Sequence, residues 1–308
     1  MLADNYISTR SKNRTWRRAA KGFIPFAYLS PTILLLAVLS LLPIAMVFNY
    51  SLMNNVIMEK NPTFVGMANY VKLISDRVFQ QAILNTLYFT VMSVVFHLIL
   101  GLTFAMLLNT KIISPGIRGL FRVVYVLPWV FTATIIAVLW RLMLNPNGII
   151  NYLLVWSDLV SGKIEWLSSK QVALHAVTFI NIWAGYPFYM VSLLAGLQGI
   201  PDQLYEAGTI DGANKRQLFR YITLPQLKPI ILSLAMLDFI WTMHQFTLIW
   251  MTTGGGPLRV TEMLSTFTYK LAFSSYKFSM ASTSAFIILA LSMFVALFYV
   301  RNQRASDE

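Results

Sequence analysis

Two long apolar stretches of this chain carry polar side chains, which are costly to place inside hydrocarbon and are therefore candidates for function. The stretch 229–252 contains Asp238, Thr242 and Gln245, and the stretch 173–197 contains Asn181, Gly185 and Phe188. At about 100° per residue in a helix, each set of three falls on one face. The spacing predicts two helices that each present a stripe of polar and small residues.

Aromatic residues adjoin both stripes: Trp183 and Tyr186 lie near one, and Trp241 lies beside the other, where His244 also flanks the polar face. A sugar presents hydroxyl groups for hydrogen bonding and apolar ring faces for stacking. Amide, carboxyl and aromatic side chains near the membrane midplane therefore fit a carbohydrate better than an inorganic ion. The alternative is that the polar groups only bond to one another or to neighbouring helices, as buried polar residues do in membranes.

The sequence lacks the motifs of ATP hydrolysis and of common hydrolases. It has no phosphate-binding loop, since the glycines at 254–256 are not followed by Lys-Ser/Thr, and no His-Glu-x-x-His or Gly-x-Ser-x-Gly segment. It has no cysteine, which excludes disulfides and thiolate metal sites. His97 and His175 are isolated in the sequence and are interpreted as packing or interfacial residues. The chain is therefore not expected to be an enzyme or to hold a cofactor or metal.

The composition places the chain in a membrane. Of 308 residues, 57% are hydrophobic and 12% are charged, and the mean hydropathy of +0.62 is too high for a soluble globular protein. A membrane-spanning helix needs roughly 20 apolar residues. Six stretches qualify: about 23–50, 85–109, 118–142, 173–197, 229–252 and 280–300. We expect an all-α polytopic membrane protein with six transmembrane helices in residues 23–301 and both termini on one side.

The net charge of +12 comes from Lys and Arg residues that gather at the predicted helix ends and in short loops, so nucleic acid is not an expected partner. Residues 1–22 form a basic tail, which the positive-inside rule places in the cytoplasm. A short carboxyl-terminal tail, 302–308, lies on the same side. The first apolar stretch is longer than the core of a signal peptide and is interpreted as a retained helix. We expect a multi-pass protein of a prokaryotic cytoplasmic (inner) membrane, surrounded by lipids.

The loop 201–228 is a polar segment between two very apolar helices. Pro201 and Asp202 predict a helix start, and a short helix over 202–209 carries Glu206. Asp211 is expected to cap a second short helix over 213–222. Two prolines, Pro225 and Pro229, are expected to break that helix before the fifth span. The prediction is a compact helical elbow on the cytoplasmic face.

The order of residues in this loop resembles the coupling motif of the permeases of binding-protein-dependent ABC importers. The residues that carry the resemblance are Glu206, Ala207, Gly208, Asp211, Gly212, and Ile222-Thr223-Leu224-Pro225. The family usually has Glu-Ala-Ala. Gly208 stands in place of the second alanine, so one small residue replaces another. Further segments resemble the carbohydrate branch, which includes the maltose and glycerol-phosphate type permeases: Phe64-Val65-Gly66, Asn69-Tyr70, Leu127-Pro128, the segment 181–187, and Thr253 to Pro257.

The resemblance covers roughly residues 24–300 and implies a type I permease fold without its own energy source. It implies a second homologous permease, two ATPase subunits that bind ATP and Mg, and an external solute-binding protein that delivers a sugar. The elbow would then sit in a cleft of the ATPase, anchored by Glu206, and the outer residues 254–279 would meet the binding protein. The family's substrate contacts fall on the fourth and fifth spans, here Asn181, Gly185, Thr242 and Gln245, with Phe188 and Asp238 as second choices.

Two other classes of function remain open from the sequence. A proton-coupled secondary transporter could use Asp238 and His244 as proton carriers, although no internal repeat of the kind found in many such carriers is visible. A membrane enzyme or assembly factor would move no substrate across the bilayer. The segment Gly185-Tyr186-Pro187 is expected to bend its helix, the outer run 71–76 to form a short amphipathic segment, and Asn145 to Gly148 to form a turn.

Overall fold

The computed structural model describes residues 28–54, 56–110 and 114–307, so the predicted basic tail 1–22 lies outside the described residues. The helices are α2 (Leu42–Ser51), α3 (Ala68–Ile74), α4 (Arg77–Asn109), α5 (Pro115–Val130), α6 (Ala133–Met143), α7 (Ile149–Trp156), α8 (Ala173–Gln198), α9 (Asp202–Ile210), α10 (Lys215–Leu218), α11 (Leu224–Met243), α12 (Thr247–Thr252), α13 (Leu264–Tyr269) and α14 (Phe278–Asp307). Within the described residues, five helices are long and apolar enough to cross a membrane, or up to six if the bent pair α5–α6 is one span. The prediction of an all-α polytopic fold is confirmed.

Three of the predicted spans differ little from helices of the structure. The predicted 173–197 is α8, the predicted 280–300 lies within α14, and the first span is a helix over Tyr28–Ser51. The second span starts earlier than predicted, at Arg77 rather than 85, because the Asp76 carboxylate caps the helix and accepts hydrogen bonds from the backbone N–H groups of Val78 and Phe79.

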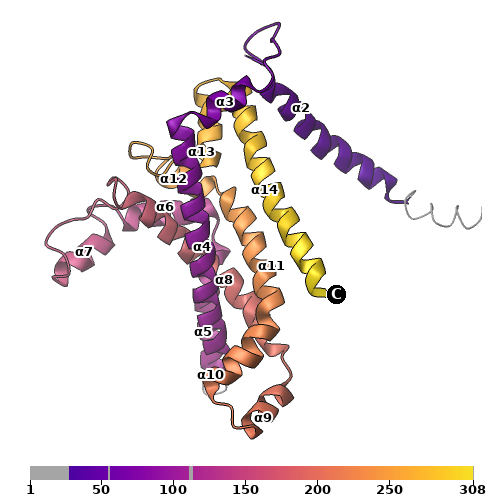
Figure 1. Cartoon of the computed structure of the whole chain (residues 1–308). Coiled ribbons are helices and arrows are strands. Elements are labelled where there is room, and N and C mark those ends of the chain that lie inside the picture. Colours follow the sequence, from indigo (N-terminus) through magenta and orange to yellow (C-terminus); the bar gives the residue numbers. More distant parts are fainter. Residues whose placement is uncertain (1–27, 55, 111–113, 308) are drawn as a thin grey trace, which may run out of the picture.

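The third predicted span, 118–142, is not a single straight helix. It divides into α5 and α6, which meet at an angle of 98°. Phe131 and Thr132 have extended backbone at the break, and the Thr132 hydroxyl accepts a hydrogen bond from the Ile135 N–H to start α6. Pro128 lies in the last turn of α5 and cannot donate a backbone hydrogen bond there. The bend turns the far end of α6 and the following α7 away from the bundle (Figure 1).

The fifth span also differs from its prediction of 229–252. The prolines do not break the helix: residues from Lys215 to Met243 form one helix of 29 residues, in which Phe219–Thr223 is a π-helical turn. The Leu224 N–H bonds to the Phe219 carbonyl across that turn, and Pro225 follows directly, so the wider turn accommodates a residue that cannot donate a backbone hydrogen bond. The helix ends instead at His244, and α12 forms a separate short helix.

The first span leaves the body of the molecule (Figure 1). None of the residues in its most apolar window is buried within the chain. Its last turn packs on α14, where the rings of Phe48 and Phe286 lie 4.8 Å apart. Asn69 of α3 holds the end of the span, since its amide donates to the carbonyls of Ser51 and Met53. The predicted amphipathic run near 71–76 is thus part of a short helix that anchors the first span.

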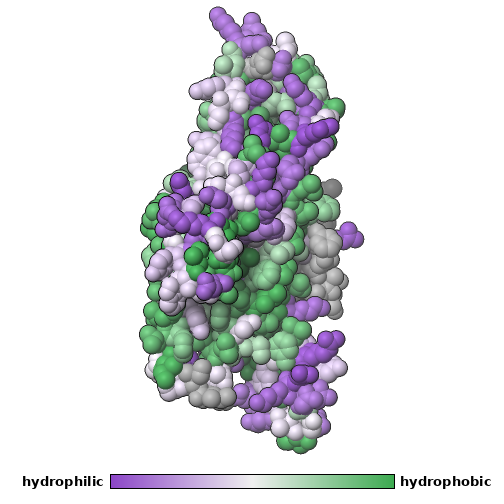
Figure 2. Space-filling model, turned by 90° about the vertical axis from the view of Figure 1, so that its left-hand side faces the viewer, coloured by the Kyte–Doolittle hydropathy of each residue, from purple (hydrophilic) through white to green (hydrophobic). Residues whose placement is uncertain are grey.

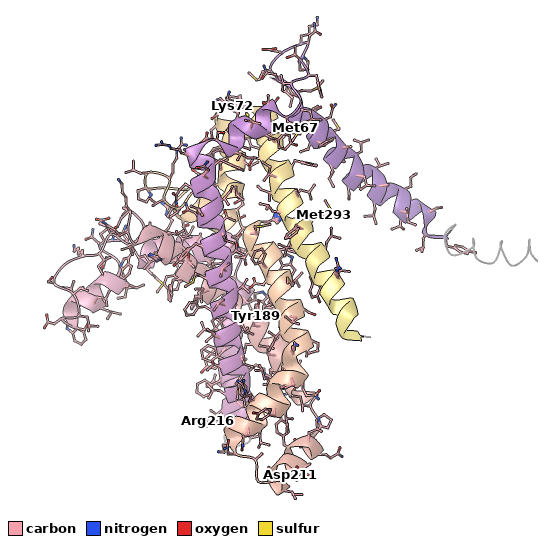
Figure 3. All side chains as sticks on the ribbon, in the orientation of Figure 1. Met67, Lys72, Tyr189, Asp211, Arg216 and Met293 are labelled. Carbon is pink, nitrogen blue, oxygen red and sulfur yellow. The ribbon has the colours of Figure 1, made fainter. Side chains whose placement is uncertain are left out.

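The centre of the molecule is the pair α4 and α8, which lie side by side. A Cβ at Gly101 of α4 would lie 2.3 Å from the Tyr189 Cβ of α8, so glycine is required for this close approach. Tyr189 lies between the two ends of the bundle, with Lys72 near one end and Asp211 near the other (Figure 3). A mostly hydrophobic band separates the more hydrophilic ends of the face in Figure 2, as expected for a protein in a bilayer.

Candidate functional site

A cavity of about 270 Å³ lies where α4, α6, α8 and α11 meet, between the two ends of the bundle. It is lined by every residue that the sequence places on the two polar stripes: Asn181, Gly185, Phe188, Asp238, Thr242 and Gln245. The helical periodicity therefore brings these six positions to one cavity. Further lining comes from residues on other elements, among them His97, Trp129 and Phe131.

Aromatic side chains form one wall of this cavity, which we call the midplane cavity. The Phe188 ring lies 6.1 Å from the Trp129 ring and 5.7 Å from the Trp241 ring, measured between centroids. Trp129 and Trp241 are 55% and 57% exposed within this chain, so their faces are available to a ligand or to a partner. Trp183 and Tyr186 do not line the cavity and instead pack against Trp140 and Phe104.

Asp238 has a partner that the sequence did not indicate. Its Oδ2 lies 2.8 Å from Nδ1 of His97 on α4, and its Oδ1 accepts a hydrogen bond from the Thr242 hydroxyl. The His97 side chain is 2% exposed and that of Asp238 is 10% exposed. The interpretation of His97 as an isolated packing residue is therefore wrong. The signal that could have found it is the one used for Asp238, a polar residue within an apolar stretch.

The imidazole of His97 also binds α8. Its Nε2 lies 3.0 Å from the main-chain carbonyl of Asn181, whose side-chain amide donates to the Ser93 hydroxyl on α4. Gly185 is one helical turn beyond Asn181, and a Cβ there would lie 2.3 Å from His97 Nε2. Because two hydrogen bonds hold the ring, it cannot move aside. Gly185 thus makes room for His97, and the segment Gly185-Tyr186-Pro187 lies inside α8, with Pro187 within the helix.

His244 does not belong to the midplane cavity. Its Nε2 lies 2.8 Å from the Ser292 hydroxyl on α14, and it shares no hydrogen bond with Asp238. The second predicted proton carrier is therefore separated from the first. His175 lies at the surface, where its Nδ1 is 2.7 Å from the Tyr88 hydroxyl. The interfacial interpretation fits this contact.

The loop after α8 folds into the predicted elbow, with a different cap. Helix α9 begins at Asp202 as expected, but Asp211 ends α9 and caps nothing after it. Asn214 caps α10 instead: its side chain accepts from the backbone N–H groups of Arg216 and Gln217, and the Gln217 side chain accepts from the Asn214 N–H. This reciprocal pair is a capping box.

Two features of α9 concern its surface. Ile210 is 87% exposed, which leaves a large apolar side chain in solvent at the tip of the elbow. Glu206 lies on one face of α9 in a shallow depression of about 590 Å³, which it lines with Asp202, Tyr205, Thr209 and Ile210. The Tyr205 hydroxyl bonds to Thr223, which fixes α9 against the start of the fifth span. Gly208 faces the side-chain ends of Leu218 and Ile222.

The opposite end of the bundle carries a partly buried ion pair, in which Glu262 is buried and Lys270 is one third exposed. Lys270 Nζ lies 2.6 Å from Oε2 of Glu262, whose Oε1 accepts from the Thr266 hydroxyl. Gly255 lies directly against this pair, since a Cβ there would come within 2.8 Å of Glu262 Oε1 and Lys270 Nζ. The φ angles of Gly254 and Gly255 are positive, a backbone conformation that glycine adopts without strain.

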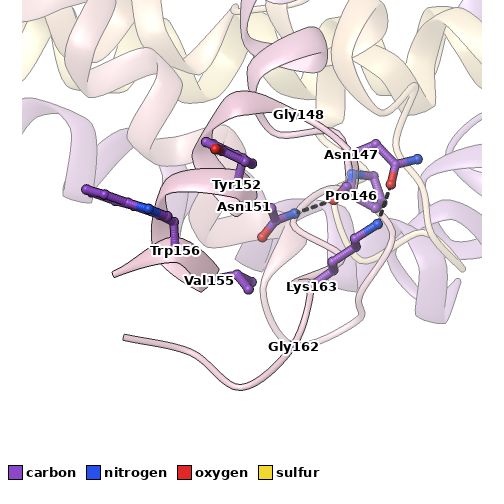
Figure 4. Close-up of a pocket in the computed structure, with 9 residues that line it drawn as sticks. All are labelled: Pro146, Asn147, Gly148, Asn151, Tyr152, Val155, Trp156, Gly162 and Lys163. Atoms are coloured by element: carbon purple, nitrogen blue, oxygen red, sulfur yellow. Dashed lines mark hydrogen bonds between the residues drawn. The ribbon is translucent and has the colours of Figure 1, made fainter. Parts of the chain in front are cut away.

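A second cavity, about 410 Å³, lies between α7 and the loop residues on either side of it (Figure 4). Asn151 organises it: its amide donates to the carbonyl of Ile164 and its Oδ1 accepts from the Ile164 N–H. Lys163 donates to the Asn147 side chain across the loop. The predicted turn at Asn145 to Gly148 is confirmed by a hydrogen bond from the Gly148 N–H to the Asn145 carbonyl.

Comparison with known proteins agrees with this architecture. Residues 97–306 match the family described as "Binding-protein-dependent transport system inner membrane component". A probable ABC transporter permease protein of Brucella suis is 33% identical over 286 residues, 92% of this chain and 98% of the relative. The trehalose/maltose transport system permease protein MalF of Thermococcus litoralis is 33% identical over 305 residues, which cover 98% of each chain.

A solved structure of a bacterial alginate ABC transporter in complex with an alginate pentasaccharide-bound periplasmic protein contains a chain with the same fold. The TM-score is 0.78 at 24% identity, covering 92% of this chain and 95% of the other. The chain thus belongs to the family of inner-membrane permeases of binding-protein-dependent ABC importers. It is the multi-pass permease subunit, which carries no cofactor; ATP is bound and hydrolysed by the partner ATPase.

Proposed function

We propose that this permease imports a sugar or oligosaccharide that a solute-binding protein delivers, and that ATPase subunits drive it through the elbow around Glu206. The observation that carries the carbohydrate assignment is the midplane cavity, which combines uncharged polar groups with aromatic rings. Asn181 and Gln245 supply amides, while Trp129, Phe188 and Trp241 supply ring faces. Such a lining is suited to hydroxyl groups and to the apolar faces of a pyranose ring.

Support for the proposed coupling comes from the surface of α9. An exposed isoleucine beside a carboxylate is a surface that a partner can cover with apolar contact and pair with a cation. In this proposal Glu206 makes the charged contact to the ATPase and Ile210 enters its cleft. Tyr205 then transmits the displacement to the fifth span through Thr223. Leu224 and Pro225 follow directly in the same helix.

The first span supports the proposal of a second permease. A transmembrane helix with none of its apolar window buried in its own chain has its faces open to lipid or to another subunit. We propose that a homologous permease packs against it and completes the midplane cavity, where Trp129 and Trp241 are half exposed. The outer residues 254–279, held by the Glu262–Lys270 pair, would form the surface that meets the binding protein.

The proposed cycle is the one that membership of the ABC importer permease family implies. ATP binding closes the ATPase dimer and draws the two elbows together, which opens the midplane cavity to the outside and to the binding protein. ATP hydrolysis returns the assembly to the inward-facing state and releases the sugar into the cytoplasm. A proton-coupled carrier is less well supported, because Asp238 is already paired with His97 and His244 lies against Ser292.

The test is charge reversal of the proposed anchor in the complete assembly. Glu206→Lys should weaken ATPase binding and ATP-driven uptake by at least about tenfold, as expected for loss of a charged contact at an interface. Glu165→Lys, which makes the same change in charge at an exposed position outside the elbow, is the control for net charge. Unchanged ATPase binding and transport in Glu206→Lys would contradict the proposal. Uptake that survives ATP depletion but stops without a proton gradient would favour the carrier.

A further inference from the structure

We infer that the permease transports an uncharged sugar. The pairing of His97 with Asp238 leaves the part of the midplane cavity that this subunit lines without net charge. The inference rests on the proposed function and narrows the substrate to neutral saccharides, excluding uronic acids, sugar phosphates and other anions. The number of protons that the hydrogen bonds of His97 and Asp238 require gives a pair without net charge.

Nε2 of His97 is a hydrogen-bond donor. Its partner is the main-chain carbonyl of Asn181, which can only accept a hydrogen bond. Nε2 therefore carries a proton. A neutral imidazole has one N–H group, so if His97 is neutral its Nδ1 is an acceptor.

Nδ1 of His97 lies 2.8 Å from Oδ2 of Asp238. A carboxylate can only accept, and two acceptors do not form a hydrogen bond at that distance. One further proton therefore lies between the two groups. Either His97 is an imidazolium beside a carboxylate, or a protonated Asp238 donates to a neutral imidazole. Both states have a net charge of zero.

The other residues that line the midplane cavity decide whether a charged ligand would find a partner there. Among the residues that the structure describes, no Lys or Arg lines the midplane cavity, and its other side chains are aromatic, aliphatic, hydroxyl or amide. Arg141 of α6 donates to the Met251 carbonyl and lines a different cavity, nearer the α12 end. An anion that entered the midplane cavity would lose its hydration without gaining a cationic partner from this subunit, which is costly.

A ligand can bind only those polar groups of the midplane cavity that are not already paired. Both oxygens of Asp238 and both ring nitrogens of His97 already have partners. Among the described residues, none forms a hydrogen bond with Oδ1 of Asn181 or with the side-chain amide of Gln245. These uncharged groups match the donors and acceptors of sugar hydroxyls. The hydrogen-bonding atoms of His97 and Asp238 are thus occupied by each other and by their neighbours, and the amides and rings are left to bind the ligand.

The test measures selectivity at the permease and leaves out the binding protein, whose own preference would otherwise dominate. The permease–ATPase assembly in nanodiscs is given an equimolar mixture of neutral oligosaccharides (maltotriose, xylotriose, galactotriose) and oligouronates (trigalacturonate, trimannuronate). Saturation-transfer NMR reports which members bind. We expect the neutral members to be favoured by about tenfold, equivalent to about 1.4 kcal/mol. Equal or stronger binding of the uronates would overturn the inference.

A pair of variants ties the selectivity to the charge of the cavity. Gln245→Lys adds a cation to the lining and should shift the ratio of bound saccharides toward the uronates. Gln245→Met removes the amide without adding charge, so the ratio should stay on the neutral side even if binding weakens. No shift in Gln245→Lys would also overturn the inference. ATP-driven uptake with the binding protein is measured separately: if no saccharide of either charge is taken up, the proposed function itself fails.

Discussion

The imidazole of His97 occupies the space that a side chain at residue 185 would need. A Cβ at Gly185 would lie 2.3 Å from Nε2 and 2.4 Å from Cε1 of the ring. The same ring is held by Asp238 on α11 and by the Asn181 carbonyl on α8. One glycine therefore lets a single side chain connect three transmembrane helices in the wall of the midplane cavity.

Gly185→Ala should disrupt this connection. The added methyl group meets a buried ring that cannot swing away without breaking its hydrogen bonds, and overpacking of this kind costs about 1–3 kcal/mol. We expect a lower thermal unfolding midpoint of the purified assembly and loss of sugar uptake. Gly119→Ala on α5 is the matched control, because nothing in the described chain lies within 4 Å of its added Cβ. Equal midpoints for the two variants would contradict the role of Gly185.

His97→Ala should be more damaging than Gly185→Ala. It leaves the Asp238 side chain buried without its partner, and removal of one member of a buried pair costs about 3–5 kcal/mol. His244→Ala provides the comparison, since His244 makes only one described side-chain hydrogen bond, to Ser292, and its loss costs about 1 kcal/mol. Thermal unfolding of both variants measures the difference. A larger loss in His244→Ala would contradict the assignment of His97 as the partner that matters.

Lys270→Met should loosen the outer loop that carries the glycines. Glu262 has a side chain that is only 2% exposed, and without Lys270 its carboxylate keeps only the Thr266 hydroxyl as a described hydrogen-bond donor. Loss of a hydrogen bond to a charged group costs about 1.5–3 kcal/mol. We expect faster amide hydrogen exchange over residues 254–262 and weaker binding of the solute-binding protein. Lys270→Arg keeps the charge and should show a smaller change; exchange as slow as wild type in Lys270→Met would argue against the role of the pair.

Helical periodicity explains why the six residues of the two polar stripes could be placed on one cavity from sequence. Asn181, Gly185 and Phe188 share a face of α8, and Asp238, Thr242 and Gln245 share a face of α11 and its end, whatever the helices pack against. Contacts between helices carry no such period. His97 is separated from Asp238 by 141 positions, and nothing in the local pattern of either stretch reports that distance.

The predictions about individual helices that the structure contradicts were wrong for local reasons. The bend between α5 and α6 depends on extended backbone at Phe131 and Thr132, within a stretch whose hydropathy is continuous. The expected break at Pro225 was avoided by the π-helical turn before it, which hydropathy does not reveal. The cap at Asn214 could have been recognised, because Asn214 and Gln217 have the spacing of a capping box.

The central claim is that an ATPase drives this chain through α9, and cross-linking of that helix tests it most directly. The chain has no cysteine, so Ile210→Cys provides a single thiol at the most exposed apolar position of the elbow. With a heterobifunctional reagent that joins a thiol to an amine, the complete assembly should give an adduct between residue 210 and a lysine of the ATPase subunit, in a yield that changes between ATP-bound and nucleotide-free states. Absence of that adduct in every nucleotide state, in an assembly that still transports sugar, would contradict the account.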